Sequence, residues 1–175
     1  MRWTAFPLHP EIPEKGLTLE QLFAGRPVDW GQVMARLQQA AQEAGLPFGV
    51  RTMSYNTRLA QELAKWAETK GKGEAFSQVV FRAYFVDGLN VGDIQELLSL
   101  VEILGLSGAE ARNVLTERRY RDVVDSDWSR SRQLGIQAVP TFLLNQALLV
   151  GAQSYEQLVT FVEAGGVKKR NGGLL

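Results

Sequence analysis

The residue types that usually perform covalent or acid–base chemistry are scarce in this chain. Its 175 residues include no cysteine and one histidine, His9, which lies in a proline-flanked segment. Without cysteine the chain can form no disulfide, thiolate metal site or thiol nucleophile. The sequence also shows no glycine-rich phosphate loop, no metal-ligand spacing and no Ser-His-Asp set. A single imidazole without partner signals is more often structural than catalytic. We therefore predict no catalytic residue and no metal site.

Composition and charge exclude several classes of partner. The chain carries 19 basic and 19 acidic residues, a net charge of zero and a pI near 6.6, whereas a nucleic-acid footprint should be basic. No apolar stretch is long enough for a membrane span, and the N-terminus lacks a secretory signal. A chain that is 45% hydrophobic and 22% charged is typical of a soluble globular protein, which we expect in the cytoplasm. The length favours one domain, or one domain with an insertion.

The elements that must position any site begin with a predicted strand. Arg2–Phe6 alternates polar and apolar residues and is closed by Pro7. A long helical stretch follows, indicated by a helical period of apolar residues and by capping pairs such as Thr18 with Gln21. The predicted helices are Leu19–Phe23, Val28–Ala44, a helix from the N-cap Asn56 to Thr69, Glu74–Val86, a helix after the Asp93–Glu96 pair, and one long helix from Ala109 to about Gln133.

Strand patterns return after Gly135. Thr141–Leu144 and Ala147–Val150 are predicted to form a hairpin with a tight turn at Asn145-Gln146. Ser154 and Gln157 form a capping pair before a last helix, Tyr155–Ala164, which Gly165-Gly166 ends. The basic residues from Lys168 on indicate a frayed tail.

This order of elements carries a resemblance to a known family. The segment Leu134–Phe142, with the hairpin and capped helix that follow it, resembles the second half of a thioredoxin fold. More specifically, the chain resembles the DsbA family, in the branch of FrnE-like proteins and 2-hydroxychromene-2-carboxylate isomerases. The resemblance runs from about Trp3 to Ala164, and three other stretches carry it: Trp3–Pro10, Asn56-Thr57, and Phe81–Phe85 with its Asp87-Gly88 turn.

The resemblance implies an α/β, thioredoxin-like fold with a large all-helical insertion. The parts expected are residues 1–16 (the family's second strand and a loop), 17–105 (the helical insertion), 106–164 (long helix, hairpin and last helix) and 165–175 (tail). The family's first strand and first helix, which carries Cys-x-x-Cys or a serine in its place, are then missing from this chain. Three explanations stay open: a late start or fragment, a second copy that completes the sheet, or a tail that folds back.

The resemblance also assigns substrate-binding residues. It implies a cis peptide bond between Val139 and Pro140, which leaves the backbone of Val139 free to pair with an extended substrate or with glutathione. Val139, Pro140 and Thr141 would then guide the substrate; the alternative is a structural kink before a strand. Asn56 matches an asparagine that lines the glutathione pocket in related isomerases and transferases, and a plain helix N-cap explains it equally well.

A last group of candidate residues is Gly151, Ala152 and Gln153. They fall where those relatives bind the γ-glutamyl end of glutathione through a Ser-Asp pair at a helix N-terminus. Ala152-Gln153 lacks the carboxylate that would hold the α-amino group. This departure argues against glutathione and favours the FrnE-like branch.

Three functions remain open from the sequence. The first is the body of a DsbA-family (FrnE-like) thiol–disulfide oxidoreductase acting on peptide or protein disulfides, inactive in dithiol chemistry as this cysteine-free chain. The second is a glutathione-dependent isomerase or transferase, for which glutathione would be the one cofactor. The third is a non-enzymatic, dimeric peptide-binding or scaffold protein. We predict no other cofactor and neither a nucleic-acid nor a membrane partner.

Overall fold

The structure of the chain, a computed structural model, describes residues 2–25 and 29–168. Two compact units make up the fold, residues 1–127 and residues 128–175. Two sequence predictions fall outside the described residues: the start of a helix at Val28 and the basic tail beyond Lys168. Among the described residues, no helix is both long and apolar enough to cross a lipid bilayer.

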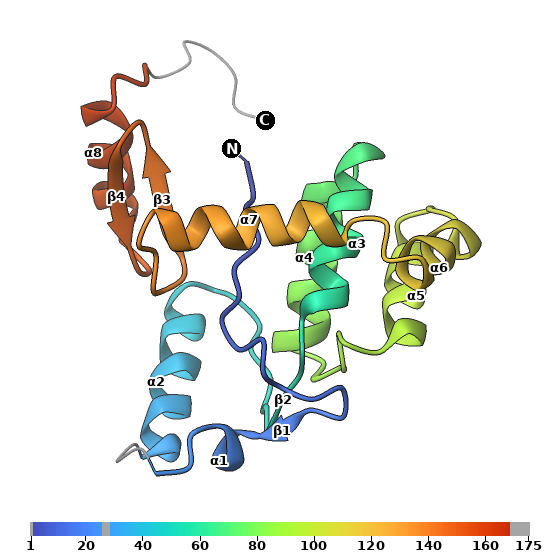
Figure 1. The fold of residues 1–175 in the computed structure, drawn as a ribbon. Helices are drawn as coiled ribbons and strands as arrows, with labels where there is room; N and C mark the ends of the chain where they lie inside the picture. The colour runs from blue at the N-terminus through green and yellow to red at the C-terminus, as the bar shows by residue number, and fades with distance from the viewer. Residues whose placement is uncertain (1, 26–28, 169–175) are drawn as a thin grey trace. The chain divides into compact units, whose positions relative to one another are not determined.

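The first unit is mostly helical (Figure 1). A pair of two-residue antiparallel strands, β1 and β2, joins Leu17 to Ser54 and Thr18 to Met53. The elements in chain order are β1 (Leu17–Thr18), α1 (Leu19–Leu22), α2 (Trp30–Glu43), β2 (Met53–Ser54), α3 (Arg58–Thr69), α4 (Gly73–Phe85), α5 (Ile94–Ile103), α6 (Gly108–Thr116) and the first half of α7 (Arg121–Gln133). The helix predicted to follow the Asp93–Glu96 pair is α5, and Asp93 accepts hydrogen bonds from two backbone N–H groups of its first turn.

The core of this unit forms around α3. This helix packs against α4 and α6, and α5 packs against both of those helices. On the face of α3 that points into the core, Ala60, Leu63 and Ala67 are buried and Leu59 is partly buried. Trp66 is also buried, and its indole N–H donates to Glu110 Oε1 at 3.1 Å. Burying a large ring while pairing its one polar atom avoids the cost of an unsatisfied donor.

The predicted single helix from Ala109 to Gln133 is wrong. The chain forms two helices, α6 and α7, which are separated at Glu117–Tyr120. Arg118 has φ +53°, in the left-handed region, and a residue in this conformation interrupts a right-handed helix. Its guanidinium then donates to both carboxylate oxygens of Glu62, from Nε at 2.8 Å and from Nη2 at 2.6 Å. The pairing with a buried charge therefore outweighs the helical tendency of this segment.

The predicted strand at Arg2–Phe6 is also not formed. No strand among the described residues pairs with it, and side chains bind its backbone groups instead. The Ala5 N–H donates to Asp127 Oδ2 at 2.9 Å. Lys65 Nζ donates to the Trp3 carbonyl at 2.9 Å, and Gln61 Nε2 donates to the Phe6 carbonyl at 3.3 Å. Polar side chains thus satisfy the extended backbone as a neighbouring strand would.

The second unit contains the predicted hairpin and last helix. β3 (Thr141–Leu144) and β4 (Ala147–Val150) pair antiparallel, with Thr141 opposite Val150. Asn145 takes the left-handed conformation that the tight turn requires, and its side chain donates to the Gly165 carbonyl at 3.2 Å. α8 (Tyr155–Ala164) begins with the capping box of Ser154 and Gln157. These predictions are confirmed.

A buried carboxylate, Glu62 on α3, connects the elements of the first unit. It is fully buried and accepts hydrogen bonds from Arg58 Nε at 2.6 Å and from Arg118. Burial alone would raise the pKa of Glu62, but the hydrogen bonds and charges of Arg118 and Arg58 outweigh burial and hold it below its usual value near 4.5. The carboxylate is therefore charged in the folded protein at neutral pH.

Replacing Glu62 by glutamine should lower the free energy of unfolding by about 3 kcal/mol at pH 7, because Arg118 loses its counter-charge and Arg58 loses one of its two, Asp125 being the other. A depressed native pKa contributes stability above the unfolded-state value, and that stability is lost as pH falls through the native pKa. The difference between wild type and Glu62→Gln should therefore shrink below about pH 4.5. Urea unfolding over a pH series measures both effects. Glu117→Gln, which breaks the exposed pair with Arg119, is the control, and an equal loss in both variants would contradict the argument.

Candidate functional site

Val139, Pro140 and Thr141 lie at the start of the hairpin in the second unit. The Val139–Pro140 peptide bond is cis. Val139 forms no hydrogen bond within the described residues, and it is 45% exposed. Thr141 already belongs to β3, and its hydroxyl donates to the Ala138 carbonyl at 2.6 Å. The main chain of Val139 is therefore a free donor and acceptor next to a paired strand.

Gly151, Ala152 and Gln153 follow β4 and lie beside this point. The Gly151 N–H donates to the Pro140 carbonyl at 2.7 Å, and Gly151 has φ +88°, a conformation that glycine adopts without strain. The Gln153 side chain turns back and donates to the Val150 carbonyl at 2.6 Å. The structure thus brings six predicted site residues into one group, which we call the hairpin site: Val139, Pro140, Thr141, Gly151, Ala152 and Gln153.

The hairpin site offers main-chain recognition without ionisable side chains. None of its six residues carries a group that titrates near neutral pH. An exposed main chain beside a strand can pair with an extended peptide, and neighbouring apolar side chains then set a preference. Val150, directly opposite Thr141, is 51% exposed and supplies such an apolar surface. The arrangement leaves main-chain groups available for pairing, and none of the six side chains is a thiol, an imidazole or a carboxylate.

Asn56, the remaining predicted site residue, lies in the first unit, and its side chain forms hydrogen bonds there. Its side-chain Nδ2 donates to the carbonyls of Ile12 at 2.8 Å and Pro10 at 3.3 Å. Its Oδ1 accepts from the Arg58 N–H at 2.9 Å, although the N-cap position of α3 falls on Thr57 rather than on Asn56 as predicted. Both ends of the Asn56 amide are therefore occupied within its own unit, where they fasten an extended loop to the start of α3.

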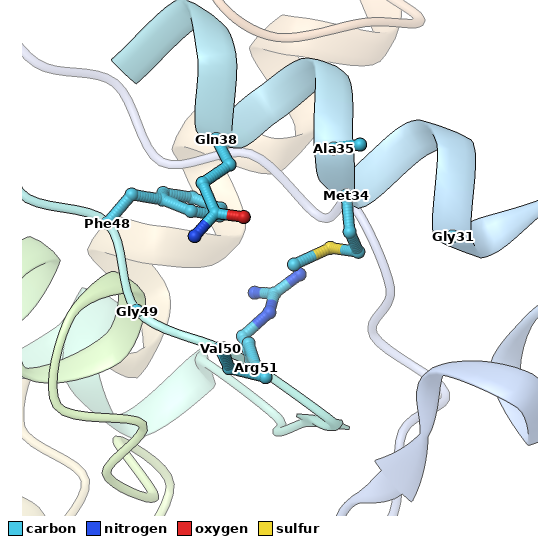
Figure 2. Close-up of a pocket in the computed structure, with 8 residues that line it drawn as sticks. All are labelled: Gly31, Met34, Ala35, Gln38, Phe48, Gly49, Val50 and Arg51. Carbon is cyan, nitrogen blue, oxygen red and sulfur yellow. The ribbon is translucent and has the colours of Figure 1, made fainter. Parts of the chain in front are cut away.

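A second grouping, which the sequence patterns did not predict, is a cavity in the first unit. It is partly open to solvent, has a volume of about 230 Å³ and lies between α2 and the segment Phe48–Arg51, of which Val50 is exposed (Figure 2). The guanidinium of Arg51 points into it. No motif marks Arg51, because its neighbours come from distant parts of the chain. Among the described residues, no cluster of three or more His, Asp and Glu side chains could hold a metal ion.

Comparison with known families gives the class of this fold. The family model for the DSBA-like thioredoxin domain matches residues 1–163, so the chain belongs to this family. The fold is accordingly mixed α/β, of the DsbA-like thioredoxin type with a helical insertion, as predicted.

Two relatives are more than 25% identical to this chain over the residues that align. The uncharacterized protein YwbO of Bacillus subtilis (strain 168) is 33% identical over 119 residues, which cover 66% of this chain and 60% of YwbO. The match thus spans less than two thirds of that relative. The crystal structure of the probable DsbA oxidoreductase SCO1869 from Streptomyces coelicolor is 27% identical and superposes with a TM-score of 0.85, covering 98% of this chain and 77% of SCO1869.

Two more distant solved structures share the fold. A 2-hydroxychromene-2-carboxylate isomerase is 21% identical, with a TM-score of 0.66 over 78% of this chain and 66% of the isomerase. The cytosolic disulfide reductase DsbM from Pseudomonas aeruginosa, solved with GSH, is 24% identical, with a TM-score of 0.59 over 78% of this chain and 76% of DsbM. At these identities the likeness establishes the fold alone.

Replacing Asn56 by alanine should loosen the loop that it fastens. The change removes three hydrogen bonds of a partly buried side chain, so we expect the free energy of unfolding to fall by about 2 kcal/mol. Hydrogen exchange should rise at residues 10–12, and the amide spectrum of the hairpin should not change. Asn113→Ala, at an exposed position on α6, is the control. Unchanged stability in Asn56→Ala would instead leave the side chain available for a ligand.

Proposed function

We propose that this chain is the substrate-guiding body of a FrnE-like thiol–disulfide oxidoreductase that acts on extended peptide or protein disulfides in the cytoplasm. In this proposal residues 17–105 are the helical insertion and 106–164 the second thioredoxin-like part. Membership of the DSBA-like family and the likeness to SCO1869, a probable DsbA oxidoreductase, support it. A cytoplasmic location is supported by the absence of cysteine from these residues and by the fold shared with DsbM, a cytosolic disulfide reductase.

Such an enzyme needs two parts, a thiolate that attacks the substrate disulfide and a surface that binds the substrate backbone. The thiolate attacks one sulfur of the substrate disulfide, a mixed disulfide forms, and the other sulfur leaves as a thiolate. The 175 residues contain no cysteine, so in this proposal the attacking thiolate comes from outside them. This chain contributes the hairpin site, which aligns the substrate backbone beside β3.

The observation that carries the proposal is the free main chain of Val139. Its N–H and carbonyl make no hydrogen bond within the described residues, whereas the neighbouring strand residues are paired. Two hydrogen bonds to an extended segment would hold the substrate without reading its side chains. A general disulfide enzyme needs this tolerance, because its substrates share a disulfide and an extended backbone.

A nuclear magnetic resonance titration with an extended cystine peptide tests this assignment. Saturable shifts should appear at residues 138–141 and 150–153. Val139→Pro removes the N–H and keeps the carbonyl, so it should weaken binding by up to about tenfold, as the loss of one hydrogen bond would. Val139→Ala keeps the main chain and serves as the matched control, with affinity close to wild type.

The same chain should reduce no insulin disulfides above the buffer blank, since it has no thiol. Reduction above the blank, or peptide shifts confined to other residues, would overturn the proposal. Spectra of the free variants, recorded first, establish that α8 and the hairpin remain folded.

Glutathione-dependent isomerase or transferase chemistry is a second candidate, favoured by the shared fold with the isomerase and with GSH-bound DsbM. Two contacts count against it. Gln153 is turned toward Val150, and the Ser154 hydroxyl already accepts the Gln157 N–H at the start of α8. Calorimetry with reduced glutathione separates the candidates: a saturable heat that Gln153→Ala abolishes would favour this second function.

A second copy of the chain is the partner that the third candidate, a dimeric peptide-binding scaffold, requires. Val139, Leu143, Leu148 and Val150 are exposed apolar residues around the hairpin, as a sheet-completing dimer would use. If the dimer forms, the melting temperature should fall over about a hundredfold dilution, because association stabilises by mass action. A melting temperature independent of concentration, with a monomer mass by light scattering, would exclude it.

A further inference from the structure

The cavity beside α2 combines an apolar lining with one charged group. Met34, Ala35 and Gln38 of α2 form one wall, and Phe48, Val50 and Arg51 form the facing wall. Figure 2 shows the Arg51 side chain reaching across toward the thioether of Met34, with the Gln38 amide beside the ring of Phe48. A mostly apolar pocket with a few convergent polar groups is the usual form of a small-molecule site.

A close backbone approach at Gly49 sets the position of Arg51. The Gly49 N–H donates to the Phe85 carbonyl at 2.9 Å, and a Cβ on Gly49 would collide with the Val86 carbonyl oxygen. Only glycine permits this contact. The contact places the segment Phe48–Arg51 beside the C-terminal end of α4. The Arg51 guanidinium carbon then lies 4.6 Å from the centroid of the Tyr84 ring and 5.4 Å from that of Phe85. Two aromatic rings therefore support the guanidinium on the side of α4.

Arg51 has no anionic partner within the described residues. It forms no ion pair or hydrogen bond there, and its Nε is buried without an acceptor. An unpaired arginine on an open surface is ordinary, because water solvates it. Arg51 is partly buried, and it lines a cavity. Leaving a buried donor unpaired costs free energy, and no internal hydrogen bond fixes the guanidinium in one orientation.

We propose that this cavity binds a small organic monocarboxylate with a flat apolar body, which we call the Arg51 pocket. The planar guanidinium matches a carboxylate through two parallel hydrogen bonds while its face stays on the aromatic rings. The pocket lining contains a single cation and no other charged residue, which suits a monoanion better than a phosphate dianion. Met34 and Phe48 contact the body of the ligand, since thioether and ring surfaces favour aromatic groups.

This site is independent of the proposed function. It uses residues of the first unit, whereas the hairpin site lies wholly in the second, and it requires no thiol. A result against peptide binding at Val139 would not affect the proposal for the pocket around Arg51. A result against ligand binding at Arg51 would not affect the proposal for the hairpin site.

Benzoate is the probe, titrated by calorimetry and by amide chemical shifts at moderate salt. We expect saturable one-to-one binding with shifts at residues 34–38 and 48–51. Arg51→Gln should weaken it by at least about tenfold, as loss of a bidentate charged pair would. Arg36→Gln removes the same charge from an exposed position of α2 outside the pocket and should bind as wild type.

Met34→Glu is a second variant, which tests ligand binding even if Arg51→Gln folds poorly. Met34→Glu leaves Arg51 in place and sets an internal carboxylate beside it, so benzoate should no longer bind although the melting temperature is kept. Absence of saturation in wild type, or equal affinity in Arg51→Gln and Arg36→Gln, would overturn the assignment. Inorganic phosphate or benzyl alcohol binding as well as benzoate would overturn the ligand class.

Discussion

The buried carboxylate of Glu62 is the constraint on which the first unit depends. A charged group that is buried away from water needs partners of opposite charge. The Glu62 carboxylate pairs with Arg58 on its own helix and with Arg118 in the break between α6 and α7. Because Arg118 must reach Glu62, the chain leaves the helix there and starts α7 in a new direction. That start brings Asp125 to Arg58 at 2.7 Å and Asp127 to Lys65 at 2.9 Å. One buried charge thus fixes where the first turns of α7 meet α3.

The same network determines how the N-terminal segment is held. Asp127 and Lys65, once paired, each use a remaining site on the backbone of residues 3–5: the aspartate accepts the Ala5 N–H and the lysine donates to the Trp3 carbonyl. Hydrogen bonds to charged groups are stronger than neutral ones, and here both charged groups are nearly inaccessible to water. An extended segment can therefore be ordered without a neighbouring strand, which is why the alternation of side chains at Arg2–Phe6 predicted a strand that is not formed.

Local signals in the sequence predicted what depends on local chemistry. The hairpin turn at Asn145 and the capping box at Ser154 involve residues within a few positions of one another, and both were found as predicted. The helix break at Arg118 involves a partner 56 residues away, so periodicity could not indicate it. The candidate site shows the same division. Pro140 and Gly151 were identified through the family resemblance, but Arg51 depends on a backbone approach at Gly49 and on rings of α4, which no local pattern encodes.

The two proposed sites would recognise their ligands by opposite means. The hairpin site presents main-chain groups, which every extended peptide can pair with, so its specificity lies in shape and in the apolar neighbours of Val139. The Arg51 pocket presents a charge, and a buried polar group rejects ligands that leave it unpaired more strongly than an apolar wall rejects a poor fit. In the proposed function the hairpin site guides disulfide substrates to a thiolate outside these residues. Main-chain recognition suits that role, because such substrates differ in sequence. A pocket that selects one small acid among many needs recognition by a charged group. In this chain the hairpin site and the Arg51 pocket lie in different units.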